Sequence, residues 1–278
     1  MSYSLYIVAT PIGNLEDITL RALRILRESS LIAAEDTRKT IRLLQHFDIK
    51  TPMTSYYEHS KLTKLEYILG CLEKGDVALV SEAGTPGIND PGYDLIQAAI
   101  NRNIPVVVVP GPSIVVTALT VSGLPTDRFL YLGFLPVKKN ARVHFLEALV
   151  DEPSSLVFLE APHRVNESLQ DILAVLGDRR IAVCREMTKL HEEVFRGKIT
   201  EAIAHFQIPR GEFALIIEGQ REQAKPELTV GIAQQLAQLR NSGVTAREAI
   251  ARLAKETGLN RRELYKQWLD TTDAGQQH

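Results

Sequence analysis

The sequence predicts an α/β fold with two α/β domains and a small C-terminal helical domain. Short apolar runs rich in β-branched residues alternate with segments of helical period over residues 5–218, as in βα units on a largely parallel sheet. Gly123-Leu124-Pro125 interrupts this alternation as a domain linker does. Residues 229–269 carry helical patterns alone. The chain has 278 residues, 45% of them hydrophobic, which is enough for more than one core.

The first predicted domain, residues 1–122, is doubly wound. Its expected strands are 5–10, 31–35, 76–81 and 105–109. Its expected helices are 18–28, 62–73 and 94–102, and two more begin near Thr37 and Ser113. The second domain, residues 123–222, has expected strands at 129–134, 155–160, 180–185, 194–199 and 212–218. Because its last two strands are expected to run antiparallel, its sheet is predicted to be mixed.

The third domain, residues 226–278, follows a polar stretch at 219–226 and is predicted to be helix-turn-helix-like. Its helices are expected at 229–239, 245–257 and 260–269, with Thr245 and Asn260 as N-caps. Between Arg240 and Lys266 the chain has three acidic residues and seven basic ones: Arg240, Arg247, Arg252, Lys255, Arg261, Arg262 and Lys266. One interpretation is a packing appendage with a solvated face. The excess positive charge favours the other, in which Arg252, Lys255, Arg261 and Arg262 contact RNA.

Composition excludes several classes of protein. The chain has 32 basic and 34 acidic residues, so no global positive field draws it to nucleic acid. Cys71 and Cys184 are far apart and no HExxH motif occurs, which argues against a disulfide framework and a metal site. The first residues lack the basic start and long apolar run of a signal peptide, and no run is long enough to span a membrane. We therefore expect a cytoplasmic protein that binds no membrane.

Three loops rich in glycine and proline follow expected strands, at 11–14, 82–92 and 110–113. In doubly wound sheets ligands bind beyond the carboxyl ends of the strands. Glycine lets the backbone approach a ligand closely, and proline fixes the loop before binding. One such loop alone more often only turns the chain, but three at one sheet edge indicate a preformed pocket. Neither GxGxxG nor the GK[ST] ending of a P-loop is present, so the pocket is predicted to hold a nucleoside-like cofactor with few phosphates.

Seven segments resemble the tetrapyrrole-methylase superfamily: ATPIGN (9–14), AEDTR (34–38), SEAGTP (81–86), NDPG (89–92), VPGPS (109–113), EAPHR (160–164) and REMTK (185–189). Within it the chain is similar to the bacterial branch that methylates the ribose 2′-oxygen of a cytidine in the decoding centre of 16S rRNA. The resemblance spans nearly the whole chain and departs from the family's form at Glu82, where an aspartate is expected. It implies a kidney-shaped homodimer that binds S-adenosylmethionine between its two α/β domains and acts on 16S rRNA or the small ribosomal subunit.

The resemblance also implies the residues that contact the cofactor. They are Pro11, Gly13, Glu82, Ala83, Gly84, Thr85, Ile88, Gly111, Pro112, Ser113, Phe158, Leu159, Glu160, Phe213 and Ala214.

Methyl transfer to a ribose hydroxyl needs an in-line arrangement and a group that takes or guides the proton. Glu186 and Lys189 are the first candidates, with Asp36 and His163 in support. Each has a second interpretation: Glu186 and Lys189 as a surface ion pair, Asp36 as a helix cap, and His163 as a capping or packing residue.

Arg38, Lys39 and Arg42 follow Asp36 on one expected helix and are predicted to contact RNA phosphate, although solvent is the alternative. Three functions remain open: methylation of rRNA ribose, C-methylation of a tetrapyrrole such as a precorrin or uroporphyrinogen, and RNA binding without catalysis. The basic residues favour RNA, and the glycine- and proline-rich loops favour catalysis.

Overall fold

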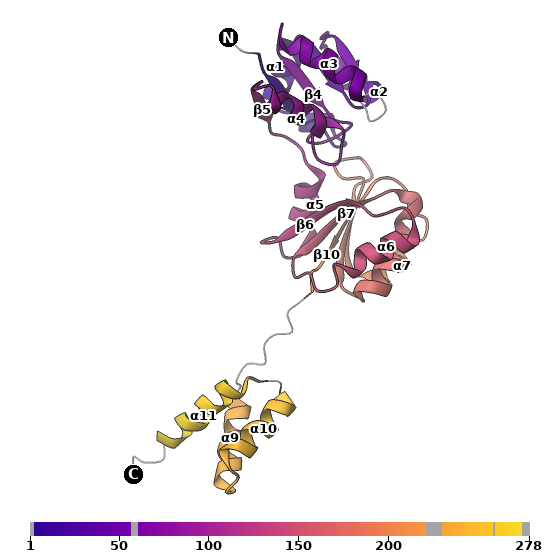
Figure 1. Cartoon of the computed structure of the whole chain (residues 1–278). Helices are drawn as coiled ribbons and strands as arrows, with labels where there is room; N and C mark the ends of the chain where they lie inside the picture. The colour runs from indigo at the N-terminus through magenta and orange to yellow at the C-terminus, as the bar shows by residue number, and fades with distance from the viewer. Residues whose placement is uncertain (1–2, 57–60, 221–229, 258, 274–278) are drawn as a thin grey trace. The chain divides into compact units, whose positions relative to one another are not determined.

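A computed structural model describes residues 3–56, 61–220, 230–257 and 259–273. The chain divides into two compact units, residues 1–219 and 220–278 (Figure 1). The first unit contains two five-stranded sheets and the second contains helices, so the predicted fold class is confirmed.

The first sheet is entirely parallel, in the order β3-β2-β4-β1-β5. Its strands are β1 (Leu5–Val8), β2 (Leu31–Ala34), β3 (Met53–Ser55), β4 (Val77–Val80) and β5 (Val106–Val109). Its helices are α1 (Leu20–Glu28), α2 (Thr37–His46), α3 (Lys61–Leu72) and α4 (Gly92–Asn101), with a 3-10 turn at Leu15–Asp17. Residues of β4 alternate between two cores, Val77 and Leu79 in one and Ala78 and Val80 in the other. Both faces of the sheet are therefore covered, as expected of a doubly wound domain.

The second sheet is mixed, as predicted, in the order β6-β7-β10-β8-β9. Its strands are β6 (Phe129–Phe134), β7 (Ser155–Glu160), β8 (Arg180–Arg185), β9 (Glu193–Lys198) and β10 (Phe213–Ile217). Strand β10 is antiparallel to β7 and β8, and β9 is antiparallel to β8. The helices of this part are α5 (Ile114–Ser122), α6 (Lys139–Glu147), α7 (Val165–Leu176) and α8 (Ile199–His205), with a 3-10 turn at Pro162–Arg164.

Helix α5 belongs to the packing of the second sheet. Its Ala118 and Leu119 share a core with Cys184 of β8 and Ala214 of β10. The predicted domain boundary at 122/123 lies after this helix, because Gly123 and Pro125 follow α5. The chain already packs against the second sheet from α5 onward.

The second unit consists of α9 (Val230–Asn241), α10 (Ala246–Thr257) and α11 (Arg261–Asp273) around a small core that includes Leu236, Leu253 and Trp268. Thr245 caps α10 as predicted, since its Oγ1 accepts a hydrogen bond from Glu248 N and donates one to Glu248 Oε2. The polar stretch predicted at 219–226 and the helix start at 229 fall largely outside the described residues. None of the helices in the described ranges is long and apolar enough to cross a membrane.

Candidate functional site

The three glycine- and proline-rich loops follow β1, β4 and β5, which are neighbours in the sheet. Thr10 and Gly84 exchange two backbone hydrogen bonds, of 2.9 and 3.0 Å. Thr85 Oγ1 donates to Pro112 O at 3.3 Å. Gly84 has a φ of +78°, a backbone conformation that favours glycine. The loops therefore form one connected ledge at the carboxyl edge of the sheet.

The ledge meets the second sheet within the same unit. A Cβ built on Gly13 would lie only 2.6 Å from Lys189 Cγ and 2.8 Å from Met187 O. Asn14 N donates to Thr188 Oγ1 at 3.0 Å, and Asn89 Nδ2 donates to the Tyr131 hydroxyl at 3.2 Å. Two cavities lie along this junction.

The first, which we call the acidic cavity, has a volume of about 350 Å³. Its walls are mostly apolar, and the described residues that line it include five carboxylates but no lysine, arginine or histidine. The lining residues are Ile12, Glu35, Ser81, Glu82, Ala83, Ile88, Asn89, Asp90, Ile114, Tyr131, Phe134, Leu159, Glu160, Ala161, Pro162, Met187, Glu212, Phe213 and Ala214.

The second, which we call the basic cavity, adjoins the first and has a volume of about 420 Å³. Lys39, Arg42 and Lys189 give it its positive charge, opposed by Glu82 and Glu212. Its other lining residues are Thr10, Pro11, Ile12, Gly13, Leu15, Thr40, Leu43, Ser81 and Ala83.

The acidic cavity fits the cofactor expected from the sequence. S-adenosylmethionine carries a positive sulfonium and an ammonium group but no phosphate, so carboxylates attract it and apolar walls can accommodate its nucleoside. A phosphate-rich nucleotide would instead meet five carboxylates. At the adjoining basic cavity, Thr10 Oγ1 is buried without a hydrogen-bond partner among the described residues, which leaves one polar atom for a ligand.

Glu35 is a carboxyl group of the acidic cavity whose pKa is raised. It follows β2 directly and accepts a hydrogen bond from Glu82 N at 2.9 Å. Burial raises the pKa of Glu35; the hydrogen bond from Glu82 lowers it, the negative charges of Asp90 and Glu82 raise it, and the net pKa lies above the ordinary value.

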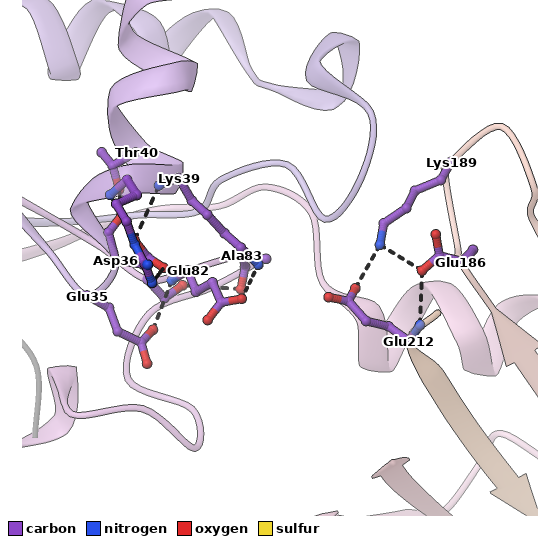
Figure 2. Close-up of polar contacts among 11 residues, drawn as sticks. Glu35, Asp36, Lys39, Thr40, Glu82, Ala83, Glu186, Lys189 and Glu212 are labelled. Atoms are coloured by element: carbon purple, nitrogen blue, oxygen red, sulfur yellow. Dashed lines mark hydrogen bonds and ion pairs between the residues drawn. The ribbon is translucent and has the colours of Figure 1, made fainter. Parts of the chain in front are cut away.

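Lys189 binds two carboxylates at the edge of the basic cavity (Figure 2). Its Nζ lies 2.9 Å from Glu186 Oε1 and 3.0 Å from Glu212 Oε2. Burial lowers the pKa of Lys189, but the two hydrogen bonds outweigh burial, so the pKa lies above its usual value. The hydrogen bond from Lys189 lowers the pKa of Glu186. In this state Lys189 is a cation and Glu186 a weak base, so the pair can position a substrate better than it can remove a proton.

The residues implied for the cofactor divide into three groups. Glu82, Ala83, Ile88, Leu159, Glu160, Phe213 and Ala214 line the acidic cavity. Pro11 and Gly13 line the basic cavity. Gly84, Thr85, Gly111, Pro112, Ser113 and Phe158 line neither. The first five of these form the ledge below the cavities, whereas Phe158 is fully buried in the core of the second sheet.

Of the four residues predicted to be catalytic, only Lys189 lines a cavity; Glu186, Asp36 and His163 line neither. Asp36 caps α2, since its side chain accepts hydrogen bonds from the backbone of Arg38 and Lys39. His163 is exposed in the 3-10 turn after β7. The nearby Glu160 is buried, paired with Arg164 at 3.3 Å and bonded to Ser168 at 2.6 Å, which gives it a structural role beside its place in the cavity wall.

Of the three basic residues predicted on α2 to contact RNA, two line a cavity and one does not. Lys39 and Arg42 line the basic cavity, whereas the Arg38 side chain is 89% exposed and contacts Asp36. In the second unit Arg252, Lys255, Arg261 and Arg262 are all exposed, and Arg252 pairs with Glu256 at 3.1 Å.

Sequence reasoning did not single out Glu35, Asp90, Tyr131 or Glu212 as site residues. Glu35 is the last residue of the predicted strand 31–35, and Glu212 is the first residue of the predicted strand 212–218. Their positions at strand ends could have identified them as candidate site residues. Asp90 accepts hydrogen bonds from Gly87 N and Gly92 N, and so shapes the loop after β4. The position of Tyr131 depends on the pairing of the two domains, which no local pattern encodes.

Comparisons with known proteins identify the family of this chain. The model of the family described as Tetrapyrrole (Corrin/Porphyrin) Methylases matches residues 4–203. A relative from Halalkalibacterium halodurans named "Ribosomal RNA small subunit methyltransferase I" is 45% identical, over 94% of this chain and 93% of its own length. The protein of that name from Escherichia coli O157:H7 is 44% identical, over 96% of this chain and 94% of its own length.

A third relative of that name, from Thermotoga maritima, is 49% identical over 98% of its own length but only 77% of this chain. A solved structure of uroporphyrin-III-C-methyltransferase from Thermus thermophilus has a TM-score of 0.56 at 20% identity, covering 77% of this chain and 94% of that chain. The likeness to that structure shows a shared fold.

Proposed function

Because this chain belongs to the tetrapyrrole methylases, and within them to the small-subunit ribosomal RNA methyltransferases I, we propose that it methylates a ribose 2′-oxygen in 16S rRNA. The methyl donor of methyltransferases with this fold is S-adenosylmethionine. The target we propose is a cytidine of the decoding centre, acted on in the small ribosomal subunit.

The observation that carries the proposal is the pair of adjoining cavities with opposite charge. The acidic cavity suits the cationic, phosphate-free cofactor, and the basic cavity suits a polyanion. Group transfer needs a donor and an acceptor site that meet, and these two cavities share part of their lining.

In the acidic cavity, Ile88, Leu159 and Ala214 would contact the cofactor with apolar atoms, and Glu35 and Asp90 would face its positive and hydroxyl groups. When bound, S-adenosylmethionine supplies an electrophilic methyl group. The protein's own part is to hold the ribose oxygen in line with that methyl group and to exclude water.

In the basic cavity, Lys39 and Arg42 of α2 are placed to bind phosphate groups next to the reacting ribose. Lys189 adds a third cation that two carboxylates hold in place. We assign the exposed basic residues of the second unit to further RNA contacts, and we propose that the enzyme acts as a homodimer.

Transfer of a radiolabelled methyl group tests the function. Small ribosomal subunits from cells lacking this enzyme would be incubated with the protein and labelled S-adenosylmethionine, and the RNA digested for nucleoside mass spectrometry. We expect one 2′-O-methylated cytidine.

A parallel reaction offers uroporphyrinogen, because a basic cavity would also attract the carboxylates of a tetrapyrrole. Label in the tetrapyrrole and none in the RNA would contradict the proposal.

A further inference from the structure

The acidic and basic cavities share one wall, and that wall contains two ionisable groups. The residues that line both cavities are Ile12, Ser81, Glu82, Ala83 and Glu212. In an in-line transfer the nucleophilic oxygen, the methyl carbon and the sulfur lie on one line. If the cofactor lies on one side and the ribose on the other, the reacting oxygen lies at this wall. The carboxylates of Glu82 and Glu212 are then the proton acceptors nearest to it.

The two carboxylates are held in parallel ways (Figure 2). Glu82 N donates to Glu35 Oε2 at 2.9 Å, and Glu212 N donates to Glu186 Oε1 at 2.9 Å. The side chain of Glu82 pairs with Lys39, and that of Glu212 pairs with Lys189. Both lysines line the basic cavity, where the RNA is expected.

The two pairs differ in how firmly the lysine is held. Lys189 is bound by two carboxylates at once and its side chain is 30% exposed. The side chain of Lys39 is 48% exposed and belongs to the first turn of α2, next to Arg42 of the same cavity. A phosphate group entering the basic cavity can therefore replace Glu82 as the partner of Lys39 more easily than it can displace both partners of Lys189.

We propose that Glu82 accepts the proton of the ribose hydroxyl and that Lys39 is a positioning residue, which holds Glu82 until an RNA phosphate takes its place. This inference rests on the proposed function. As the oxygen–methyl bond forms, the methyl–sulfur bond breaks and the sulfur keeps its electron pair. The hydroxyl proton moves to the Glu82 carboxylate and leaves to solvent after release of the product.

The charged groups around Glu82 come from several elements. Glu35 and Asp36 follow β2, Lys39 lies on α2, Asp90 lies in the same loop, and Glu212 precedes β10. Carboxylates predominate in this set, and Lys39 is the cation that pairs with Glu82.

The test is a single-turnover comparison of Glu82→Gln with the wild-type enzyme on small ribosomal subunits. Glutamine keeps the size of the side chain but cannot take up a proton, so the rate should fall by at least about 100-fold, the lower range for general-base catalysis. The comparison is made at saturating S-adenosylmethionine and RNA, with saturation checked by calorimetry for the cofactor and by filter binding for RNA, because Glu82 also lines the acidic cavity and its charge contributes to cofactor binding there. The matched control is Glu66→Gln, since Glu66 is also an exposed glutamate in an ion pair, with Arg102 at 2.7 Å, and should react at the wild-type rate.

The dependence of the rate on pH distinguishes a catalytic role of Glu82 from a purely structural one. The wild-type rate should fall as the pH is lowered and the carboxylate takes up a proton. Glu82→Asp should keep this dependence at a reduced rate, whereas the residual rate of Glu82→Gln should lose it.

Three results would overturn the inference. The first is a Glu82→Gln rate within threefold of the wild type. The second is a loss of 100-fold in Glu212→Gln without one in Glu82→Gln. In both cases the proposed function stands, because the wild-type enzyme still methylates RNA. A wild-type enzyme that transfers no methyl group to RNA would overturn the proposed function and this inference together.

Discussion

At the residue scale, Lys189 stabilises the loop after β8 by binding the carboxylates of Glu186 and Glu212. Glu186 and Thr188 adopt positive φ angles, of 50° and 66°, which are costly for residues other than glycine. Lys189 offsets this cost by binding both carboxylates, and Glu186 Oε1 also accepts the backbone N–H of Glu212. The loop after β8 is thereby fixed against the start of β10, next to Gly13 of the first domain.

Glu186→Gln should lower the thermal midpoint of unfolding at pH 7 by about 2–4 °C, as expected for a loss of about 1 kcal/mol in a unit of this size. The pKa of Glu186 in the folded protein lies below 4.5, mainly because of the hydrogen bond from Lys189, so its contribution to stability is present above pH 4.5 and lost as the pH falls through the folded pKa. The difference between variant and wild type should therefore be smaller at pH 4 than at pH 7, by circular dichroism. An equal difference at both pH values would contradict the assignment. Glu66→Gln is the control for an exposed pair.

Residue patterns along the chain did not determine which charged side chains line the cavities. Asp36 and Glu35 are neighbours in the sequence, yet Asp36 caps α2 whereas Glu35 lines the acidic cavity. Both follow a buried strand, and a difference of one position along the chain decides which side chain faces the cavity. The pairing of Lys189 with Glu212 joins residues 23 positions apart, whereas the local spacing predicts only Glu186 as its partner.

At the element scale, strand positions could be predicted because β-branched runs bounded by glycine and proline are local signals. Strands β7 and β8 have the predicted bounds, Ser155–Glu160 and Arg180–Arg185. Edge strand β3 has three residues, too few for a period, and was not predicted as a strand. The order of the strands depends on packing between distant segments, so the adjacency of β4, β1 and β5 became visible only in the structure.

The contact between the loops after β1 and β8 can be tested through Gly13. In Gly13→Ala the new methyl group would overlap Lys189 Cγ, Thr188 Oγ1 and Met187 O, all within 2.8 Å. Since one of these atoms belongs to the backbone, the two loops must move apart. We expect the rate of methyl transfer to fall at least about tenfold, because small displacements of reacting groups are costly.

Gly70→Ala is the matched control for Gly13→Ala. Gly70 lies inside α3, and no atom of the described residues outside its chain neighbours and the helix's own backbone lies within 4 Å of its Cβ position. Alanine should stabilise this helix by about 0.5–1 kcal/mol and leave the rate unchanged. A Gly13→Ala enzyme with wild-type rate and wild-type affinity for S-adenosylmethionine would show that the contact is not needed for the site.

At the scale of the whole molecule, the two cavities and the exposed basic residues of α10 and α11 lie in different units. All residues that line the two cavities belong to residues 1–219. The Thermotoga maritima relative bears the same name as the longer ones, although about a quarter of this chain has no counterpart in it. We expect the first unit to carry the chemistry and the second unit to add affinity for RNA.

A truncated protein of residues 1–219 tests this division. It should bind S-adenosylmethionine within about threefold of the full chain and keep methyl transfer at saturating RNA, while its affinity for RNA falls. The logarithm of the affinity should depend less steeply on the logarithm of the salt concentration, by about 0.7–0.9 per lost phosphate contact.

Full-length Arg261→Gln/Arg262→Gln/Lys266→Gln should show the same change, since all three side chains are exposed on α11. The control, Arg24→Gln on α1, removes an exposed arginine that pairs with Glu28, and should leave the salt dependence unaltered. Filter binding between about 0.05 and 0.2 M salt measures the slope. An unchanged slope in both the truncated and the substituted protein would assign the second unit to a role other than RNA binding.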